Sequence, residues 1–550
     1  MIIGNINKIN LSISSFERII NDGNLYVDKT RLIEHFLETP STVQLVARQR
    51  RLGKSLNMDT IRCFLTDRKD LRHLFKGLYI ESSPVWEKAH SAPVFYFDFK
   101  ALRPGTYRDQ VIDTMIDHIC AMIEPENLDF ALKRKFHQII ESPERASESL
   151  LFLTEVAYKL TGKNAYLLID EYDKLLMENF DSPEYEAMRK FETALLSSAL
   201  KGNPYLEKAL LTGVMRISHE SMLSGLNNIV TFDVFKDNVY TTDYGLTDTE
   251  MTALHALAPF DMEAIRNWYN GIRIGGQAIH NIYSVMSYLS DSMYAKGNSS
   301  YDCYWGKSGT LDMIIHLLND QRRLTLAKLL GGNPVQVQVD NRISLQQLDS
   351  QKGDEAFFSL LIQAGYLALN DRQPSGTSTV TIPNKELMIV WKNFILSRFY
   401  TDATQVRTLF DHTNNLTLLE QDIAYFLSER LSYHDLSLYK GENIQHVQER
   451  AYHIYILGLL SAHEDMRFRY PLSNRESGDG RYDILVETPN AHYIFELKTS
   501  HKNEDLAKDA AKALAQIETK RYGADLATTG KKLIKIGVAL WGKQCKVKCG

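Results

Sequence analysis

Short apolar runs alternate with longer amphipathic stretches along the first half of the chain. Four runs have the length and the β-branched or aromatic content of buried strands: STVQLVA (41–47), APVFYFDF (92–99), NAYLLID (164–170) and KALLTGV (208–214). Apolar residues at helical spacing lie between these runs, in SLNMDTIRCFL (55–65) and around 108–123 and 146–160. Strands that alternate with helices predict βαβ units and a mainly parallel sheet.

The pattern changes twice in the rest of the chain. Between about 246 and 435, Leu, Tyr and Ala recur at helical spacing, and Thr247 followed by Glu250 is a capping-box signature. Later segments again read as strands and one Ala-rich helix: strands at 482–487, 492–498 and 532–541, and the helix at 505–522. We therefore expect an α/β fold in three parts, at 1–245, 246–435 and 436–550.

Composition places the chain among ordinary globular proteins. Its 550 residues are 44% hydrophobic and 24% charged, with a formal net charge of -5. No apolar run approaches the roughly 20 residues of a membrane span, and the N-terminus lacks the unbroken apolar core of a signal peptide. The five scattered cysteines indicate a reducing compartment. We expect a cytoplasmic protein with no membrane partner, and we read Cys545 and Cys549 as plain surface or tail residues without zinc.

The segment RQRRLGKS, which follows the first predicted strand, is a candidate phosphate loop. Gly53 lets the backbone approach a ligand, Lys54 can reach β- and γ-phosphates, and Ser55 can ligate Mg²⁺. The full pattern is GxxxxGK[ST], and an arginine replaces its first glycine here. The arginines of the loop either contact phosphates or are simply solvated: Arg48, Arg50 and Arg51.

Polar residues end the third and fourth predicted strands. Asp170 can hold Mg²⁺ through water, and Glu171 can polarise the attacking water of an ATPase. The simpler interpretation is an acidic pair that caps a core strand. Thr212 stands where a side chain can sense the γ-phosphate, and Arg216 can reach a phosphate in cis or in a neighbouring subunit. Together with the loop, these residues predict an ATP site with Mg²⁺.

A second set of charged residues lies near the C-terminus, in YDILVETPNAHYIFELK. If the turn is centred between Pro489 and Asn490, Asp483 lies directly opposite Glu496. Two like charges in that position are destabilising unless something compensates, and a shared Mg²⁺ would do so. Lys498 shares a face with Glu496 because strand side chains alternate, and it can stabilise charge that develops on phosphorus. The simpler interpretation is a salt-bridged surface hairpin.

Two more residues extend this set to a nuclease-type site. Glu449, on a helical stretch upstream, can add a third carboxylate, and the Leu497 carbonyl can add another oxygen. Mg²⁺ prefers a few oxygen ligands in octahedral array, with water filling the rest. Gln516, on the helix that follows the core strands, is a candidate contact to nucleic acid. The spacing Asp-x(12)-Glu-x-Lys is that of the metal and catalytic core of PD-(D/E)XK nucleases.

The whole chain resembles a bacterial family with an AAA-ATPase-like N-terminal domain and a C-terminal PD-(D/E)XK nuclease-like domain. The resemblance rests on long motifs: YVDKTRLIEHFL (26–37), RQRRLGKSLNMD (48–59), YLLIDEYDK (166–174), LTGVMRISHESMLSGLNN (211–228), WYNGIRIG (268–275), IPNKEL (382–387), ERAYHIYILGLL (449–460), SNRESGDGRYDI (473–484) and FELK (495–498). The arginine at 48 is typical of this family, whereas Gln49 stands where the family usually has Pro.

The resemblance implies a P-loop NTPase-like parallel sheet, a helical middle region and a nuclease-like α/β domain. It implies ATP binding by four residues: Gly53, Lys54, Ser55 and Asp170. It also implies a nuclease fold with its site residues in place: Glu449, Asp483, Glu496 and Lys498. Three residues are implied to line that site, where the arginines would contact nucleic acid: Arg475, Glu476 and Arg481.

Two functions follow from these residues. The first is an ATP-binding, ATP-hydrolysing protein whose nucleotide state regulates a Mg²⁺-dependent nuclease. The second is a nucleotide-dependent switch or binding module that does not cleave. Residues 441–550 hold 17 Lys and Arg against 14 Asp and Glu, whereas the other 440 residues hold 46 against 54. This basic C-terminal part favours a nucleic-acid partner, DNA before RNA, and the sequence is compatible with a homo-oligomer.

Overall fold

The computed structural model divides the described chain into two compact units. The first unit comprises residues 1–317 and 336–387, and the second comprises residues 318–335 and 388–550. The described residues are 1–215, 228–294, 301–305, 314, 317–318, 320–330, 332–340, 353–372, 376–391, 410, 412–430, 456, 469–473, 476–477, 480–488, 490–500, 502–524, 526, 530–541 and 544–550. Three predicted site residues lie outside them: Arg216, Glu449 and Arg475.

A five-stranded parallel sheet forms the centre of the first unit. Its strands are β3 (Val43–Ala47), β4 (Val94–Asp98), β5 (Ala165–Asp170), β6 (Leu206–Gly213) and β7 (Ile229–Phe232). They lie in the order β4-β5-β6-β3-β7, and every neighbouring pair is parallel. The α/β fold and the mainly parallel sheet are thus confirmed. All side chains of β3 and β5 are buried, as expected of strands covered on both faces.

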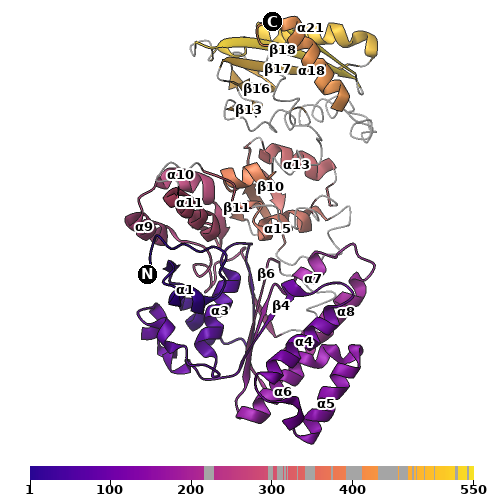
Figure 1. Ribbon diagram of the computed structural model, residues 1–550. Coiled ribbons are helices and arrows are strands. Elements are labelled where there is room, and N and C mark those ends of the chain that lie inside the picture. The colour runs from indigo at the N-terminus through magenta and orange to yellow at the C-terminus, as the bar shows by residue number, and fades with distance from the viewer. Residues whose placement is uncertain are drawn as a thin grey trace. The chain divides into compact units, whose positions relative to one another are not determined.

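Helices cover both faces of this sheet. Figure 1 shows α1 and α3 on one side and α4, α6 and α8 on the other. The helices of this part are α1 (Phe16–Asn21), α2 (Arg31–Glu38), α3 (Lys54–Leu65), α4 (Tyr107–Cys120), α5 (Phe130–Glu141), α6 (Ser149–Thr161), α7 (Lys174–Met177) and α8 (Tyr185–Leu200). A two-stranded sheet accompanies them, in which β1 (Ile2–Ile3) pairs with β2 (Tyr26–Val27), the strand between α1 and α2.

The remainder of the first unit is not purely helical. Its helices are α9 (Asp248–Leu257), α10 (Met262–Tyr269), α11 (Ile282–Tyr294) and α15 (Asp354–Ala364). Two small sheets accompany them, the hairpin of β8 (Ile272–Ile274) with β9 (Gln277–Ile279), and β10 (Val335–Gln338), β12 (Thr377–Thr381) and β11 (Ala368–Arg372) in that order. The predicted capping box is confirmed, since Thr247 and Glu250 exchange hydrogen bonds at the start of α9.

The second unit is built on a mixed five-stranded sheet. Its strands are β13 (Arg469–Ser473), β16 (Ile484–Glu487), β17 (Ala491–Thr499), β18 (Lys532–Trp541) and β19 (Gln544–Cys549), in that order. β17 and β18 are parallel, and the other pairs are antiparallel. The hairpin register is the predicted one, with Ile484 opposite Phe495 and Glu487 opposite His492. The other elements are α13 (Asp320–Leu330), α18 (Leu416–Arg430), α21 (Leu506–Thr519) and the pair β14 (Glu476–Ser477) and β15 (Gly480–Arg481).

The two faces of this sheet carry different helices. Residues at one set of alternating positions on β17, such as Phe495 and Leu497, pack in one core with Leu419 and Phe426 of α18. Residues at the other set face α21, as Ile494 does with Ile517. Cys545 and Cys549 are buried inward-facing residues of β19 in the α18 core, so their interpretation as surface or tail residues is wrong. Burial raises the pKa of both thiols to about 12.

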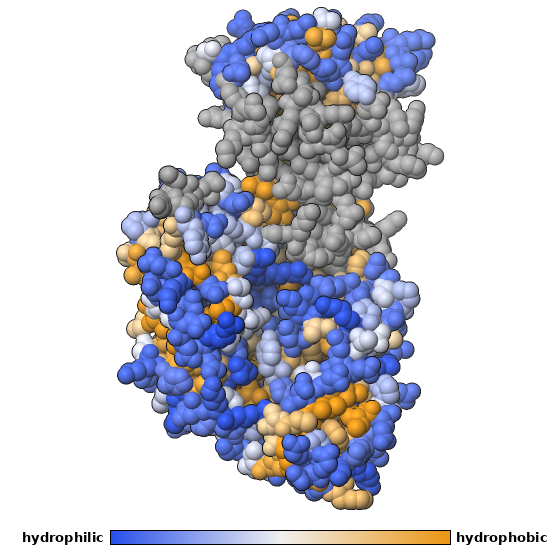
Figure 2. Space-filling model, in the orientation of Figure 1, coloured by the Kyte–Doolittle hydropathy of each residue, from blue (hydrophilic) through white to orange (hydrophobic). Residues whose placement is uncertain are grey.

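The surface of the first unit in view in Figure 2 is mainly hydrophilic, with apolar side chains in separate patches. Within the described residues, no helix combines the length and the apolar character needed to cross a membrane.

Candidate functional site

The predicted phosphate loop joins the end of β3 to the start of α3. Gly53 caps α3 with φ 89°, a left-handed conformation that glycine adopts without strain. The Lys54 ammonium is buried and donates to the carbonyls of Arg48 (3.1 Å) and Gln49 (3.2 Å), which folds it back along its own loop. It also lies 3.6 Å from Glu171 Oε1. The loop therefore presents a helix N-terminus and a buried cation at one point, which is the arrangement that binds phosphate.

The ends of three parallel strands bring the acidic residues to this loop. β6 lies between β3 and β5, so the Thr212 hydroxyl, at the end of β6, meets the Asp170 carboxylate at the end of β5. The Ser55 hydroxyl donates to the other Asp170 oxygen, Oδ2, at 2.6 Å. The Asp170 carboxylate thus accepts hydrogen bonds from the Thr212 and Ser55 hydroxyls, which are the two expected near a nucleotide and its metal. Oxygens of this kind suit Mg²⁺, which is usually bound through one or two carboxylates plus phosphates.

Glu171 follows at the strand end in an unusual backbone conformation. Its φ of 51° is in the left-handed region, which is strained for a residue other than glycine and recurs at functional sites. Burial raises the pKa of its carboxyl, but the charges of Lys54, Arg50 and Lys174 outweigh burial and hold the pKa below its usual value. Glu171 is therefore ionised at neutral pH and can accept a proton or a hydrogen bond from water.

A cavity of about 270 Å³ opens beside the phosphate loop. Loop and α3 residues from Arg51 to Asn57 form one wall together with Glu171. Apolar residues of two distant segments form another part of the lining. They are Ile9, Leu11 and Ile13 near the N-terminus and Ile282, Tyr283 and Met286 of α11. A mostly apolar wall beside a phosphate-binding loop is suited to a flat nucleobase. The sequence prediction missed this wall, whose only signal is the alternation of apolar residues at 9, 11 and 13.

Two arginines of the loop, Arg48 and Arg51, contact protein groups. The guanidinium of Arg48 is fully buried and donates to the Ala47 carbonyl (2.9 Å), the Phe232 carbonyl (2.8 Å) and Asn238 Oδ1 (3.1 Å). Arg48 does not line the cavity. Its hydrogen bond to the Phe232 carbonyl connects the loop to the end of β7. Arg51 lines the cavity, and its guanidinium carbon lies 3.9 Å above the Tyr283 ring.

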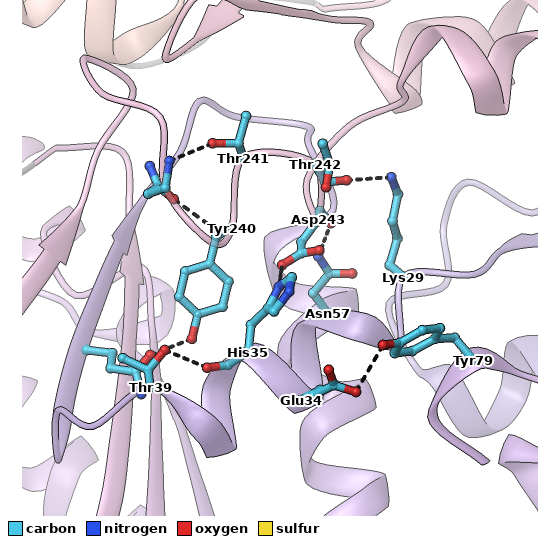
Figure 3. A network of polar contacts seen from close by, with 12 residues as sticks. Lys29, Glu34, His35, Thr39, Asn57, Tyr79, Tyr240, Thr241, Thr242 and Asp243 are labelled. Carbon is cyan, nitrogen blue, oxygen red and sulfur yellow. Dashed lines mark hydrogen bonds and ion pairs between the residues drawn. The ribbon is translucent and has the colours of Figure 1, made fainter. Parts of the chain in front are cut away.

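A network of polar contacts fixes the segment after β7 against α2 and α3 (Figure 3). The Asn57 amide of α3 donates to the Asp243 carbonyl at 2.9 Å, while the Asp243 carboxylate lies 2.7 Å from His35 Nδ1 of α2. Lys29 donates to the Thr242 carbonyl at 2.9 Å and pairs with Glu250 at 2.7 Å. Lys29, Asn57 and Asp243 also line the cavity, so this network sets the position of its floor.

The second unit brings four predicted residues together on the α21 face of its sheet. Asp483 directly precedes β16, and its Oδ2 accepts from the Leu497 backbone N–H at 2.7 Å. Glu496 is buried, accepts a hydrogen bond from the Gln516 amide of α21 and lies 3.8 Å from the Lys498 ammonium. The Lys498 side chain is 32% exposed, so its charge is open to a ligand. The hairpin register continues by one residue to place Asp483 opposite Glu496.

Gly537 explains how Gln516 reaches the strand. Gly537 pairs with Glu496 across β17 and β18, and α21 passes directly over it. A Cβ atom at this position would lie 2.3 Å from the Ala510 carbonyl oxygen and 2.4 Å from the Leu514 nitrogen. Glycine therefore lets the helix backbone approach the sheet closely at the candidate site.

The donor set of this site fits a hard divalent cation. Asp483 and Glu496 offer carboxylates, and burial raises the pKa of Asp483 despite the Leu497 N–H and Lys498, which lower it. A bound cation would offset the charge of two neighbouring acids. Within the described part of the chain, no group of three or more His, Cys, Asp and Glu side chains is placed to hold a metal. The predicted third carboxylate, Glu449, lies outside that part, and so does the side chain of Arg481.

Two stretches of the chain match known families. Residues 10–223 match a family described as a predicted AAA-ATPase, and residues 447–549 match the PD-(D/E)XK nuclease superfamily. The chain joins an AAA-ATPase-like region to a PD-(D/E)XK nuclease-like region. The phosphate loop lies in the AAA-ATPase-like region, and Asp483, Glu496 and Lys498 lie in the nuclease-like region.

Similar proteins add little about function. A protein of Azotobacter chroococcum mcd 1, described as an uncharacterized protein in the vnfD 5′ region, is 27% identical over 552 residues, which cover 96% of each chain. Among solved structures, the ORC2 protein of Aeropyrum pernix in ADPNP-ADP complexes aligns at 12% identity over 67% of this chain and 93% of its own. The TM-score of that alignment is 0.25.

Proposed function

We propose that the AAA-ATPase-like region binds and hydrolyses ATP, and that its nucleotide state regulates Mg²⁺-dependent phosphodiester cleavage by the nuclease-like region. We further propose that the substrate is nucleic acid, DNA before RNA. The observation that carries the proposal is the convergence of Asp483, Glu496, Lys498 and Gln516 on one face of the sheet.

Each polar group near the phosphate loop has a role in ATP binding or hydrolysis. The N-terminus of α3 and the Lys54 ammonium hold the phosphates, and Ser55 with Asp170 would hold Mg²⁺. Thr212 positions Asp170, and Glu171, ionised and 3.6 Å from Lys54, orients the attacking water. The apolar wall from the N-terminus and α11 takes the base.

The residues assigned to cleavage lie on one face of the sheet in the second unit. Asp483, Glu496 and the Leu497 carbonyl would hold Mg²⁺, which when bound supplies a Lewis acid and an activated water. Lys498 stabilises charge that develops on the phosphate, because its ammonium is exposed on the same face as the two acids. Gln516 orients Glu496 by its hydrogen bond.

A cleavage assay on the full chain tests the nuclease role. Single-stranded DNA, double-stranded DNA and RNA are incubated with Mg²⁺, with and without ATP. We expect cleavage by the unaltered chain, and a loss of at least about a hundredfold in Lys498→Ala, as for other single groups that stabilise a transition state. The matched control is Lys508→Ala, which removes an exposed lysine of α21 and should change the rate by less than about threefold.

The alternative function, a nucleotide-dependent switch without cleavage, makes the opposite prediction. Under that alternative, none of the substrates is cut by the unaltered chain, although ATP still binds. Cleavage that is equal in Lys498→Ala and the unaltered chain would contradict the assigned site and point to a contaminating enzyme.

A further inference from the structure

Two side chains of the phosphate loop reach into the later part of the first unit. The Gln49 amide donates to the Ile362 carbonyl, near the end of α15, at 3.3 Å. Its side chain fills the space over Gly365, where a Cβ would lie 2.7 Å from Gln49 Cδ. Arg51 stacks over Tyr283, the second residue of α11. Arg51 and Gln49 therefore connect the loop to α11 and α15, respectively.

The next residue of α11 continues this connection. The Ser284 hydroxyl lies 3.0 and 2.9 Å from the two carboxylate oxygens of Glu386. The backbone N–H groups of Tyr304 (2.7 Å) and Trp305 (2.8 Å) donate to Glu386 Oε1. Glu386 is fully buried, and burial raises its pKa to about 7 although these donors and Arg51 lower it. One buried carboxylate thus joins α11, residues 304–305 and the motif IPNKEL.

That motif is docked on its other side as well. The Asn384 amide donates to the Asn270 carbonyl at 2.7 Å. A Cβ on Gly271 would lie 2.2 Å from the Pro383 carbonyl oxygen, so the two backbones are in close contact. The motifs WYNGIRIG and IPNKEL thus pack together, although neither supplies a residue to the two sites proposed above. Leu387 is the last residue of the first unit, and the chain passes into the second unit after it.

We propose that Arg51, Tyr283, Ser284 and Glu386 form a relay that reports nucleotide occupancy of the phosphate loop to the end of the first unit. This inference rests on the proposed nucleotide binding and specifies how that binding is communicated. Glu386 acts here as a positioning residue, because it touches Ser284 and the 304–305 backbone and not the cavity.

The relay has a physical basis in competition for Arg51. The Arg51 guanidinium both lines the cavity and lies over the Tyr283 ring. Phosphates bind guanidinium groups by charge-assisted hydrogen bonds, which are stronger than an exposed cation–π contact. A nucleotide in the cavity therefore draws Arg51 away from Tyr283. In that state the Tyr283 ring exchanges its contact with Arg51 for one with the base, which shifts the start of α11. Its hydrogen bond to Glu386 through Ser284 then weakens, so the ligand favours one of two arrangements.

Hydrogen exchange of the Tyr304 and Trp305 amides in the full chain tests the relay. These amides donate to Glu386, so their exchange rate reports whether the hydrogen bonds to that carboxylate are intact. A non-hydrolysable ATP analogue with Mg²⁺ is added to saturation, and calorimetry measures its binding separately. In the unaltered chain we expect exchange at least about threefold faster with the analogue. In Ser284→Ala the analogue binds within about threefold of normal, because Ser284 does not line the cavity, but the nucleotide-dependent difference disappears.

The matched control is Ser287→Ala on the same helix. The Ser287 hydroxyl is also buried, but it donates at 2.8 Å to the Tyr283 carbonyl of its own helix, so this variant should keep the full difference. Tyr283→Leu, at saturating analogue, provides a second variant if Ser284→Ala does not fold, and it should also lose the difference. An unchanged difference in Ser284→Ala, or analogue binding with unchanged or slower exchange in the unaltered chain, overturns the relay. Failure of the analogue to bind would instead overturn the proposed function.

Discussion

Replacement of Gly537 tests whether α21 packs on the sheet at the nuclease-like site. The ideal Cβ of an alanine at 537 would lie 2.3 Å from the Ala510 carbonyl oxygen, whereas ordinary contacts begin at 3.4 Å. Because the obstacle is helix backbone, no rotamer change relieves it. The helix must move by about 1 Å, or the strand must bend by a similar amount.

The cost of this movement follows from overpacking in other cores. Forcing an extra methyl group into a packed core destabilises a protein by about 1 to 3 kcal/mol. For a unit of this size, that loss corresponds to a drop in melting temperature of about 2 to 12 °C. The same shift separates Gln516 from Glu496, and a displacement of 1 Å at an active site can lower a rate about a hundredfold.

Thermal unfolding of the full chain, followed by hydrogen exchange of α21, measures the stability effect. Ala511→Val is the control, because it adds bulk to the exposed face of the same helix and should cost only about 0.5 kcal/mol. If Gly537→Ala unfolds at the same temperature as the unaltered chain, α21 does not pack on Gly537 as described.

Three further predictions concern the first unit. Lys54→Met removes the buried ammonium of the loop and should weaken ATP binding at least about tenfold by calorimetry; equal affinity would contradict its assigned role. Burial raises the pKa of Glu386 from 4.5 to about 7, so between pH 4.5 and 7 the folded unit binds one proton that the unfolded chain releases. Its unfolding free energy in urea should therefore fall by roughly 3 kcal/mol as pH rises from 4.5 to 7. Glu386→Gln should flatten this slope, and an unchanged slope would refute the assignment. Thr247→Ala should cost about 1 kcal/mol through loss of the α9 cap, whereas Thr249→Ala, an exposed neighbour, should cost less.

The strands that position both sites could be predicted because they are buried on both faces. β3 and β5 read as continuous apolar runs, and β18 was predicted at 532–541, its observed bounds. β7 was missed because it is a four-residue edge strand with no fully buried side chain. β19 was not predicted because exposed lysines alternate with its buried residues, so the segment carries no apolar run. The buried residues are Cys545, Val547 and Cys549.

Local chemistry made much of the candidate site predictable, and long-range packing made the rest unpredictable. In a hairpin, the length of the turn fixes the pairing register of the two strands. The position of Asp483 opposite Glu496 therefore follows from the sequence between them. The apolar wall of the cavity beside the phosphate loop joins residues 9–13 to residues 282–286, and neither segment carries a chemical motif. The role of Arg48 also depends on distant residues, because the Phe232 carbonyl and Asn238 bind its guanidinium. The three-part domain division at 1–245, 246–435 and 436–550 stays a prediction.

The central claim is that a nucleotide in the first unit controls cleavage in the second, and the ATP dependence of cleavage tests it most directly. Initial cleavage rates are measured at saturating Mg²⁺, with and without ATP, for the unaltered chain and for Lys54→Met. The account predicts that ATP changes the rate of the unaltered chain at least about fivefold, as an allosteric coupling of ordinary size does, and leaves the rate of Lys54→Met unchanged. Equal rates with and without ATP in an unaltered chain that binds ATP and cleaves nucleic acid would contradict it.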